Sequence, residues 1–286
     1  MTFEDCFSRL TDPRRDGAGW RAVCPSCGGR NLTLRANPAN GEPWLHCFNC
    51  DASMGELFRA FGEVPSNPRR RLLRAIADPL DEKKRIAKAR EMWKASRPAE
   101  NTLVETYLRE YRAIPSDFPI PPTLRFLPQA QAMIAAVTSL DRKVVGVQLT
   151  YLDDAGAKAD RDPDKQSFGL VRGYAVHLAP VTDTIVLAEG VESALSYMVY
   201  YPDSPAWAVL SAYFLKHIIL PPSVRTVTIA GDREDRKGTG EDEAAAAAEL
   251  LEAKYNATVE IEYAPDCCND WNTFLQRERD AERRLQ

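Results

Sequence analysis

The chain has 286 residues, of which 44% are hydrophobic and 27% are charged. This composition is typical of a soluble globular protein with an apolar core, and it excludes a disordered, collagenous or coiled-coil chain. Lysine and arginine number 37 against 41 aspartate and glutamate, so the formal charge of −4 gives no overall indication of nucleic-acid binding. There is no apolar run of the roughly 18 residues that a membrane span requires and no secretion signal, which favours a cytoplasmic protein without membrane partners.

Four cysteines form two close pairs. Two residues separate Cys24 from Cys27 and Cys47 from Cys50, and nineteen residues lie between the pairs. This spacing allows two thiolates to bind one ion from each tight turn, and two such pairs complete a closed tetrahedral site. The sequence therefore predicts a structural zinc site. His46 is an alternative ligand, although four cysteines suffice. The other cysteines lack this spacing and are expected to be ordinary small side chains: Cys6, Cys267 and Cys268.

A basic segment follows the cysteine region. Residues 69–97 contain 11 lysines and arginines against 4 acidic residues, a balance of +7. Two interpretations stay open for this segment: the solvated face of a helix, and phosphate contacts beside a metal-binding module. Four prolines between residues 115 and 122 then interrupt regular structure, so a new domain is expected to begin after Pro122.

Beyond residue 122, strand-like and helix-like segments alternate. Residues 144–151 predict a strand of an antiparallel pair, with a turn at 153–156. The alternation predicts an α/β domain with a mostly parallel four-stranded sheet, preceded in the chain by the small β-rich zinc ribbon. The strands of this sheet are expected at 184–188, 206–210, 224–230 and 258–263, and the helices at 192–200, 212–218, 241–255 and 270–284.

Acidic residues follow two of these strands directly. Glu189 comes after the strand at 184–188, and Asp232, Glu234 and Asp235 come after the strand at 224–230. Because ligands bind at the carboxyl ends of parallel strands, these side chains are expected at one edge of the sheet. Converging carboxylates repel one another unless cations are present, which favours a magnesium site. On spacing alone, solvated loop acids are an equal alternative.

The cysteine region carries family-like motifs in residues 24–27 (Cys-Pro-Ser-Cys), 44–50 (Trp-Leu-His-Cys-Phe-Asn-Cys) and 55–58 (Gly-Glu-Leu-Phe). These motifs resemble the zinc-binding domain of bacterial and phage replicative primases. Cys27 stands where many cellular members have histidine, which hints at a phage or mobile-element origin. In this family the domain helps to recognise the single-stranded template. Trp44 and Phe48 are therefore candidates for base stacking, with packing of the ribbon as the alternative.

Residues 187–195 (Leu-Ala-Glu-Gly-Val-Glu-Ser-Ala-Leu) and 229–235 (Ile-Ala-Gly-Asp-Arg-Glu-Asp) resemble the Toprim domain of primases, topoisomerases, RecR-like recombination mediators and some nucleases. The resemblance implies that Glu189 is the catalytic glutamate and that Asp232 and Glu234 occupy the Asp-x-Asp pair, holding magnesium or manganese. Because the second position is glutamate and Asp235 follows it, the choice between these two ligands stays open. Glu192 either supports the site or begins the helix.

Residues 143–151 and 165–173 resemble the segment before the Toprim domain in phage, plasmid and virulence-associated primases. This similarity implies that Lys165 and Arg172 contact triphosphate or template phosphates; without it, solvent-facing positions are the usual expectation. Residues 270–272 (Asp-Trp-Asn) resemble the acidic motif that follows the last strand in the family. Asp270 is either a further carboxylate near the metal or the cap of the final helix.

Taken together, the resemblances imply a DNA primase, a nucleotidyltransferase that makes short RNA primers from ribonucleoside triphosphates on single-stranded DNA by two-metal catalysis. The alternatives are a non-catalytic, RecR-like mediator of recombination or repair and a Toprim nuclease. The sequence contains no Gly-x-x-x-x-Gly-Lys-Ser/Thr string, so a separate replicative helicase is the expected partner. Four parts are expected: a zinc ribbon at 1–64, a basic helical linker at 65–122, the N-terminal subdomain of the catalytic core at 123–183 and the Toprim domain at 184–286.

Overall fold

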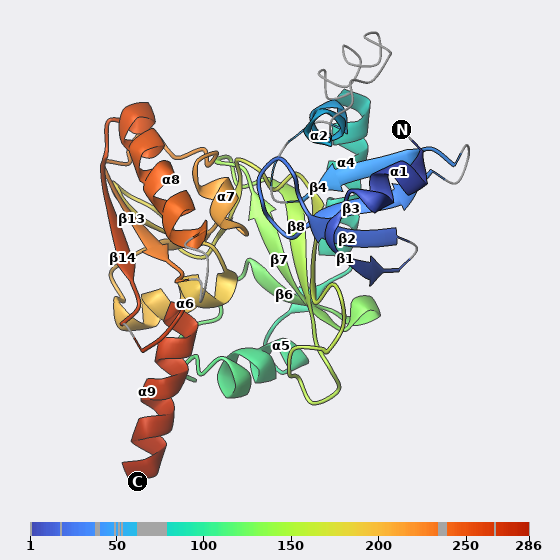
Figure 1. Cartoon of the computed structure of the whole chain (residues 1–286). Helices are drawn as coiled ribbons and strands as arrows, with labels where there is room; N and C mark the ends of the chain where they lie inside the picture. Colours follow the sequence, from blue (N-terminus) through green and yellow to red (C-terminus); the bar gives the residue numbers. More distant parts are fainter. Residues whose placement is uncertain are drawn as a thin grey trace. The chain divides into compact units, whose positions relative to one another are not determined.

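A computed structural model gives the fold (Figure 1). It describes residues 2–17, 19–37, 41–48, 50, 52, 54–61, 79–233, 239–265 and 267–285. The chain forms two compact units, Met1–Pro79 and Leu80–Gln286. None of the helices in the described ranges has the length and apolar character that crossing a membrane requires.

The N-terminal unit is built on a four-stranded antiparallel sheet in the order β1-β2-β3-β4. Leu34 and Leu45 are paired on neighbouring strands of this sheet and pack with Leu57 of helix α2 in a small core. This is the β-rich, cysteine-containing region that the sequence predicts. Its elements are α1 (Phe3–Ser8), β1 (Thr11–Asp16), β2 (Gly19–Val23), β3 (Leu32–Ala36), β4 (Pro43–Cys47) and α2 (Met54–Ala60).

The second unit contains the predicted parallel strands, which lie side by side in the order β14-β13-β11-β12. The α/β fold class is therefore confirmed, with short corrections at the ends of single elements. The parallel strands are β11 (Thr184–Ala188), β12 (Ala206–Ala208), β13 (Thr226–Gly231) and β14 (Thr258–Tyr263), and the helices are α6 (Val191–Tyr200), α7 (Ala212–Leu215), α8 (Thr239–Tyr255) and α9 (Trp271–Leu285).

Both faces of this parallel region are covered, because successive residues of a strand point to opposite faces. In β11, Ile185 and Leu187 belong to a core that includes residues of α7 and α8. Val186 and Ala188 belong to a second core that includes residues of α6 and α9. Figure 1 shows α8 along the strands β13 and β14, with α9 extending to the C-terminus. The continuous apolar sequence of β11 follows from this double burial.

The parallel strands are one part of a larger sheet of mixed orientation. Strand β12 pairs antiparallel with β10, β10 with β7, and β7 with both β6 and β8. The strand at 144–151 has two antiparallel partners, β7 and the strand β9, which follows the predicted turn at 153–156. The additional strands are β5 (Arg97–Pro98), β6 (Leu124–Leu127), β7 (Ala132–Thr138), β8 (Val144–Tyr151), β9 (Lys165–Gly169) and β10 (Ala175–His177), with the 3₁₀ turn η2 (Pro128–Ala130).

Helix α4 (Pro79–Lys94) carries much of the basic segment, and several of its cations hold it on the sheet. Arg85 donates a hydrogen bond of 2.8 Å to the Gly169 carbonyl, and Arg90 donates one of the same length to the Val144 carbonyl. The helix therefore packs within the second unit, although the sequence assigns it to a linker. Residues 69–78 of the basic segment lie outside the described residues. After α4 come α5 (Leu103–Thr106) and the π-helix η1 (Tyr107–Tyr111).

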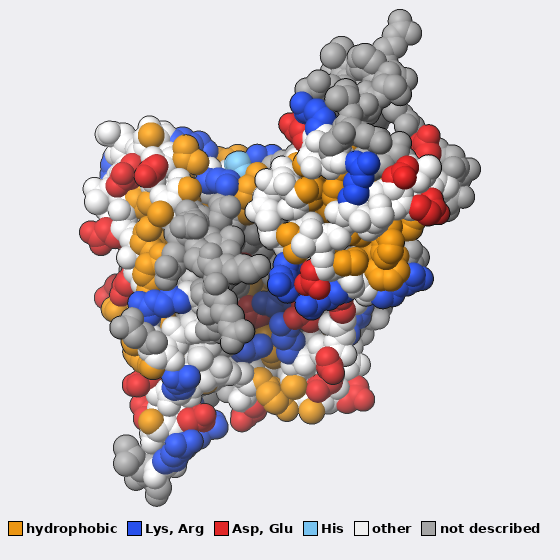
Figure 2. All heavy atoms as spheres, in the orientation of Figure 1, with side chains coloured by type: hydrophobic (Ala, Val, Ile, Leu, Met, Phe, Trp, Pro, Cys, Tyr) orange, Lys and Arg blue, Asp and Glu red, His pale blue; other side chains and the backbone are white. Residues whose placement is uncertain are grey.

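On the face shown in Figure 2, charges of both signs lie among one another in the described part of the chain. This agrees with the near balance of 37 basic and 41 acidic residues. Attraction for a polyanion must therefore come from particular cations rather than from the overall charge.

Candidate functional site

The four paired cysteines meet in the N-terminal unit. Cys24 and Cys27 lie in the turn after β2, where Gly28 adopts a φ of +73° and donates its N–H to the Cys24 carbonyl. Cys47 ends β4, and Cys50 follows it. All four sulfur atoms lie within 4.8 Å of one another. The Sγ–Sγ distance is 3.8 Å between Cys24 and Cys50 and 3.7 Å between Cys27 and Cys47.

A tetrahedral metal ion fits this cluster. Metal–sulfur bonds of about 2.3 Å in a tetrahedron separate the sulfur atoms by about 3.8 Å, which matches both distances. A hydrogen bond from Cys47 lowers the pKa of Cys24 to about 5, whereas burial raises the pKa of Cys50 to about 11. Ionising all four thiols together thus requires a cation to offset their repulsion. The cluster is a metal-binding site by its geometry.

Strand β4 presents an aromatic row on the face opposite its buried residues. The rings of Trp44 and His46 stack with centroids 5.6 Å apart, and His46 meets Phe48 edge to face at 4.5 Å. Phe48 is 56% exposed, which is unusual for a phenylalanine. His46 is exposed and is not one of the clustered ligands. The row leaves an aromatic surface accessible to a ligand.

Glu189 and Asp232 lie at the carboxyl ends of two adjacent strands of the second sheet. Strands β11 and β13 are adjacent and parallel, and Ala188 pairs with Ala230. Glu189 is the next residue after β11, and Asp232 is the next after β13. Ser193, in the first turn of α6, donates a hydrogen bond of 3.4 Å to Asp232. The sheet therefore brings together two acids that lie far apart in sequence.

Burial and the neighbouring acidic residues raise the pKa of Asp232. Burial raises the pKa of Asp232 to about 8, and the negative charges of Glu189 and Asp270 act in the same direction. Asp270 also caps α9, because its Oδ1 accepts a hydrogen bond of 2.6 Å from the Thr273 N–H. The two interpretations of Asp270 are thus compatible. A divalent cation would relieve the repulsion at this edge.

The carboxylates do not form a compact ligand cluster within the described residues. In that part of the chain, the cysteines are the only group of three or more potential ligands whose atoms all lie within 4.8 Å of one another. Glu234 and Asp235, the two alternatives for the second ligand, lie outside the described residues. Glu189 and Asp232 therefore define the described part of this candidate site.

Lys165 lies beside the first turn of α6. Its Nζ is 2.8 Å from Oε2 of Glu192, although 27 residues separate the two. Burial alone would raise the pKa of Glu192, but the charge of Lys165, its hydrogen bond and that of Tyr107 lower the pKa to about 2. Glu192 is therefore a buried, ionised carboxylate rather than only a residue that begins a helix.

A chain of hydrogen bonds through Tyr107, Arg112 and Asn272 also holds Glu192. The hydroxyl of Tyr107 donates to Glu192 Oε1 at 2.7 Å and accepts a hydrogen bond of 2.8 Å from Arg112 Nε. Asn272 donates to the Arg112 carbonyl at 2.8 Å and to Ser196 Oγ at 3.0 Å. Sequence reasoning missed Tyr107 and Arg112, because no local pattern marks a partner 85 residues away from Glu192.

Arg172 lies on the exposed connection between β9 and β10. Its guanidinium approaches the ring of His217, with 3.1 Å between Nη2 and Nε2. His217 follows α7 and also contacts the ring of Tyr213. Arg172 therefore belongs to a different set of contacts from the Lys165–Glu192 pair.

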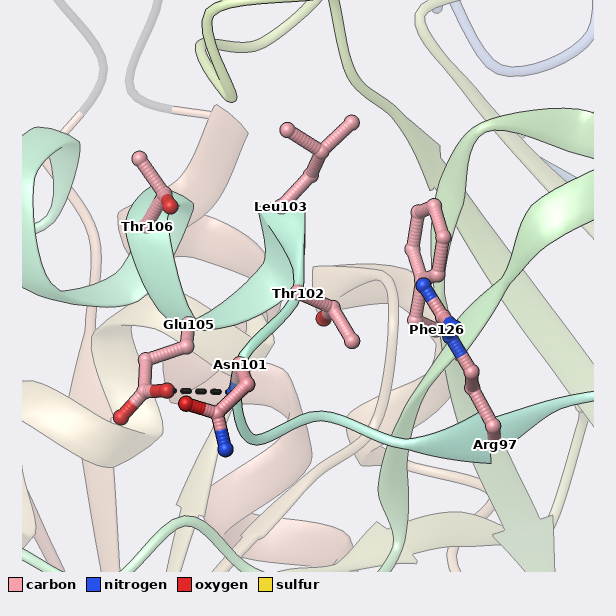
Figure 3. Close-up of a pocket in the computed structure, with 7 residues that line it drawn as sticks. All are labelled: Arg97, Asn101, Thr102, Leu103, Glu105, Thr106 and Phe126. Carbon is pink, nitrogen blue, oxygen red and sulfur yellow. Dashed lines mark hydrogen bonds between the residues drawn. The ribbon is translucent and has the colours of Figure 1, made fainter.

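A pocket of about 500 Å³ lies elsewhere in the second unit (Figure 3). The guanidinium of Arg97 lies 5.3 Å from the ring centroid of Phe126, and Glu105 accepts a hydrogen bond of 2.7 Å from the Asn101 N–H. Thr102, Leu103 and Thr106 complete its lining. Arg97, the last residue of the basic segment, lines this pocket, whereas Glu189, Asp232, Lys165 and Arg172 do not.

Two family models match the second unit. Residues 184–281 match the model described as a Toprim domain, and residues 83–178 match a domain of unknown function, DUF7146. The Toprim domain expected from the sequence is therefore confirmed for the C-terminal region. No curated protein sequence matches the chain significantly.

Solved primase structures show distant similarity to the chain. The Aquifex aeolicus primase, with its zinc-binding and RNA polymerase domains, matches at 14% identity and a TM-score of 0.49, covering 100% of this chain and 82% of that one. The primase fragment of the bacteriophage T7 primase-helicase matches at 18% identity and a TM-score of 0.39, and the match covers 56% of this chain and 68% of that one. The catalytic core of the E. coli primase matches at 14% identity and a TM-score of 0.44, and the match covers 71% of this chain and 78% of that one.

Proposed function

We propose that the chain is a DNA primase that joins ribonucleotides into short primers on a single-stranded DNA template. The observation that carries the proposal is a Toprim domain whose Glu189 and Asp232 follow adjacent parallel strands, in one chain with a four-cysteine cluster. Carboxylates at the ends of such strands suit phosphoryl transfer, because that chemistry depends on positioning and charge neutralisation.

The N-terminal unit would sample the template. We propose zinc as the ion of the cysteine cluster, because four thiolates in a closed tetrahedral arrangement are typical of structural zinc sites. The exposed ring of Phe48, with Trp44 and His46 beside it, would stack on unpaired bases. Such stacking is tolerant of sequence, so specificity would require further contacts.

The Toprim edge would hold the reacting phosphates. Glu189, Asp232 and either Glu234 or Asp235 would bind magnesium or manganese, which neutralises the triphosphate and favours ionisation of the attacking hydroxyl. The 3′-hydroxyl would lose its proton to solvent, and its oxygen would form a bond to the α-phosphorus of the incoming nucleotide. The bond between that phosphorus and the oxygen bridging to the β-phosphate would break, and pyrophosphate would leave. Lys165 and Arg172 are proposed to contact phosphate oxygens.

The test is primer synthesis by the purified full chain. Labelled ribonucleoside triphosphates, magnesium or manganese and a varied single-stranded DNA library are incubated with the wild type and with a Glu189→Gln, Asp232→Asn double variant. Short, template-dependent products that disappear in the variant would support a primase. Products that persist in the variant would contradict the assigned carboxylates.

The same experiment separates the alternatives. Retained binding of single-stranded DNA without any product would favour a non-catalytic mediator, and shortening of the DNA itself would favour a nuclease. Glutamate at position 234, where the family pattern has aspartate, is the feature that favours the non-catalytic alternative. We also propose a separate replicative helicase as a partner, and faster primer synthesis on duplex DNA when such a helicase is added would test this.

A further inference from the structure

Glu192 is a buried charge whose two oxygens have separate partners. Its side chain is 8% exposed, with Oε2 bound to the Lys165 ammonium at 2.8 Å and Oε1 bound to the Tyr107 hydroxyl at 2.7 Å. A buried carboxylate is unfavourable unless it is paired and hydrogen-bonded, so this arrangement depends on both partners. A helix N-terminus alone does not require it, because acidic residues there are normally solvated.

Lys165 keeps access to solvent in spite of this pairing. Its side chain is 30% exposed. An ammonium has three N–H donors, and the hydrogen bond to Glu192 uses one of them. The pair therefore fixes the position of a cation that still has donors for an anionic ligand.

The first turn of α6 connects this cation to the carboxylate edge. Ser193, the residue after Glu192, donates to Asp232 at 3.4 Å. The same helical turn thus contacts Lys165 of β9 and the acid that follows β13. A triphosphate with its magnesium ion requires this combination of a cation and carboxylates.

Two further hydrogen bonds hold the Tyr107 hydroxyl that binds Glu192. Tyr107 is fully buried, and its hydroxyl accepts a hydrogen bond from Arg112. Arg112 is held in turn by Asn272 of α9, which is 3% exposed and donates to the Arg112 carbonyl. The carboxylate is therefore held directly by Tyr107 of η1, and Tyr107 is held in turn through Arg112 and Asn272 of α9.

We propose that Glu192 is a positioning residue that holds the Lys165 ammonium beside the carboxylate edge to bind the triphosphate of the incoming nucleotide. This inference rests on the proposed function, since it assigns a nucleotide to that site. Glu192 itself touches no substrate. By holding the long lysine side chain in one conformation before the nucleotide binds, Glu192 lowers the conformational entropy that Lys165 loses on binding.

The inference also gives a role to residues 83–178, the domain of unknown function. Lys165 and Tyr107 belong to that match, whereas Glu192 and Asn272 belong to the Toprim match. The first region would therefore supply the cation, and the Toprim domain would supply the carboxylate that orients it.

Equilibrium binding of ATP with magnesium to the full chain, measured by calorimetry, tests the proposal. We expect Lys165→Met and Glu192→Gln each to weaken ATP binding about tenfold or more, because each disturbs a charge-assisted contact. Tyr107→Phe should weaken it less. The matched control is Lys143→Met, which removes a lysine that is 70% exposed and paired with Asp141 at 2.6 Å. Its ATP affinity should stay within about twofold of the wild type.

A double variant separates positioning from folding. Glu192→Gln leaves Lys165 without its counter-charge, so its melting temperature should fall; adding Lys165→Met removes both charges and should restore stability. ATP affinity should not recover, and Glu192→Gln should have no further effect once Lys165 is methionine. In primer synthesis, Glu192→Gln should raise the KM for nucleotide more than it lowers kcat.

Several results would overturn the inference: wild-type ATP affinity in Glu192→Gln or Lys165→Met, recovered affinity in the double variant, or no ATP binding by the wild type. A wild type that makes no primers but shows the expected pattern of ATP affinities would instead remove the primase function and leave the positioning role of Glu192 in place.

Discussion

Tyr263 lies against the residue that precedes Asp232. A Cβ atom placed on Gly231 would lie 2.5 Å from Cε1 of Tyr263, well inside van der Waals contact. The two residues are paired in the parallel register of β13 and β14. Glycine at position 231 therefore allows the tyrosine ring to cover the end of β13 where the chain turns toward the acidic edge.

Replacing Gly231 by alanine should displace either the Tyr263 ring or the end of β13. We expect a loss of about 1–3 kcal/mol in the free energy of unfolding, which is the usual cost of overpacking. The matched control is Gly190→Ala, because a Cβ there meets no atom closer than 3.5 Å. Denaturant unfolding of both variants measures the difference, and equal stabilities would contradict the close packing at Gly231.

The N-terminal unit should contain one tightly bound zinc ion per chain. Cys50→Ser should remove it, because a hydroxyl is a poor substitute for a thiolate ligand. Cys267→Ser changes an exposed cysteine outside the cluster and should keep the full metal content. Native mass spectrometry with elemental analysis gives the stoichiometry. Full zinc content in Cys50→Ser would rule out the four-cysteine site.

Magnesium should stabilise the protein more at pH 8 than at pH 6. The pKa of Asp232 is raised from 3.8 to about 8, so between these values the unfolded chain ionises this carboxyl while the folded chain keeps it protonated. The contribution of Asp232 to stability is thus full below about pH 4 and is lost as the pH rises through about 8. On the proposed function, magnesium would bind the ionised form of Asp232 and would remove this penalty.

Melting temperatures with and without magnesium at the two pH values check this expectation. Asp232→Asn should abolish the pH-dependent part of the magnesium effect, whereas Asp203→Asn, a change at an exposed position, should leave it intact. An equal magnesium effect in Asp232→Asn and the wild type would show that the ion binds elsewhere.

Phe48 should contribute to binding of single-stranded DNA without contributing much to stability. Because the ring is 56% exposed, Phe48→Ala removes little buried area, but it removes a stacking surface worth about 1–3 kcal/mol per base. We expect roughly tenfold weaker binding in fluorescence anisotropy, with recovery in Phe48→Trp. Leu140→Ala, at another exposed apolar position, serves as the control. Unchanged affinity in Phe48→Ala would leave the aromatic row without a role in template binding.

Much of the parallel sheet could be predicted because its signals are local. The apolar run at 184–188 and the helix beginning at 191 follow from composition and periodicity within a few residues, and the cysteine cluster follows from a spacing that metal geometry dictates. Long-range contacts have no such signal. The pairing of β10 with β7 and the burial of Tyr107 against Glu192 depend on how distant segments meet.

The basic segment shows a different reason for a limited prediction. Charge counting treats all cations alike, so it left a solvated face and phosphate contacts as the two interpretations. Arg85 and Arg90 instead bind backbone carbonyls of β9 and β8, a use of arginine that composition does not distinguish from the others. The ends of β11 and β13 predict the acidic edge, and the resemblance already offers Asp270 as a carboxylate near it. Only the fold shows that Asp270 both acts on Asp232 and caps α9.

The sheet crosses the boundary between the two family matches. Strand β10 ends one residue before the first match does, and Val176 pairs with Ala208 of β12, which lies inside the second match. Cutting the chain between residues 178 and 184 would therefore not release two finished domains. Each fragment would expose an edge strand whose backbone amides and carbonyls are unpaired, and such edges promote aggregation. Any truncation or domain exchange should therefore keep residues 83–178 and 184–281 together.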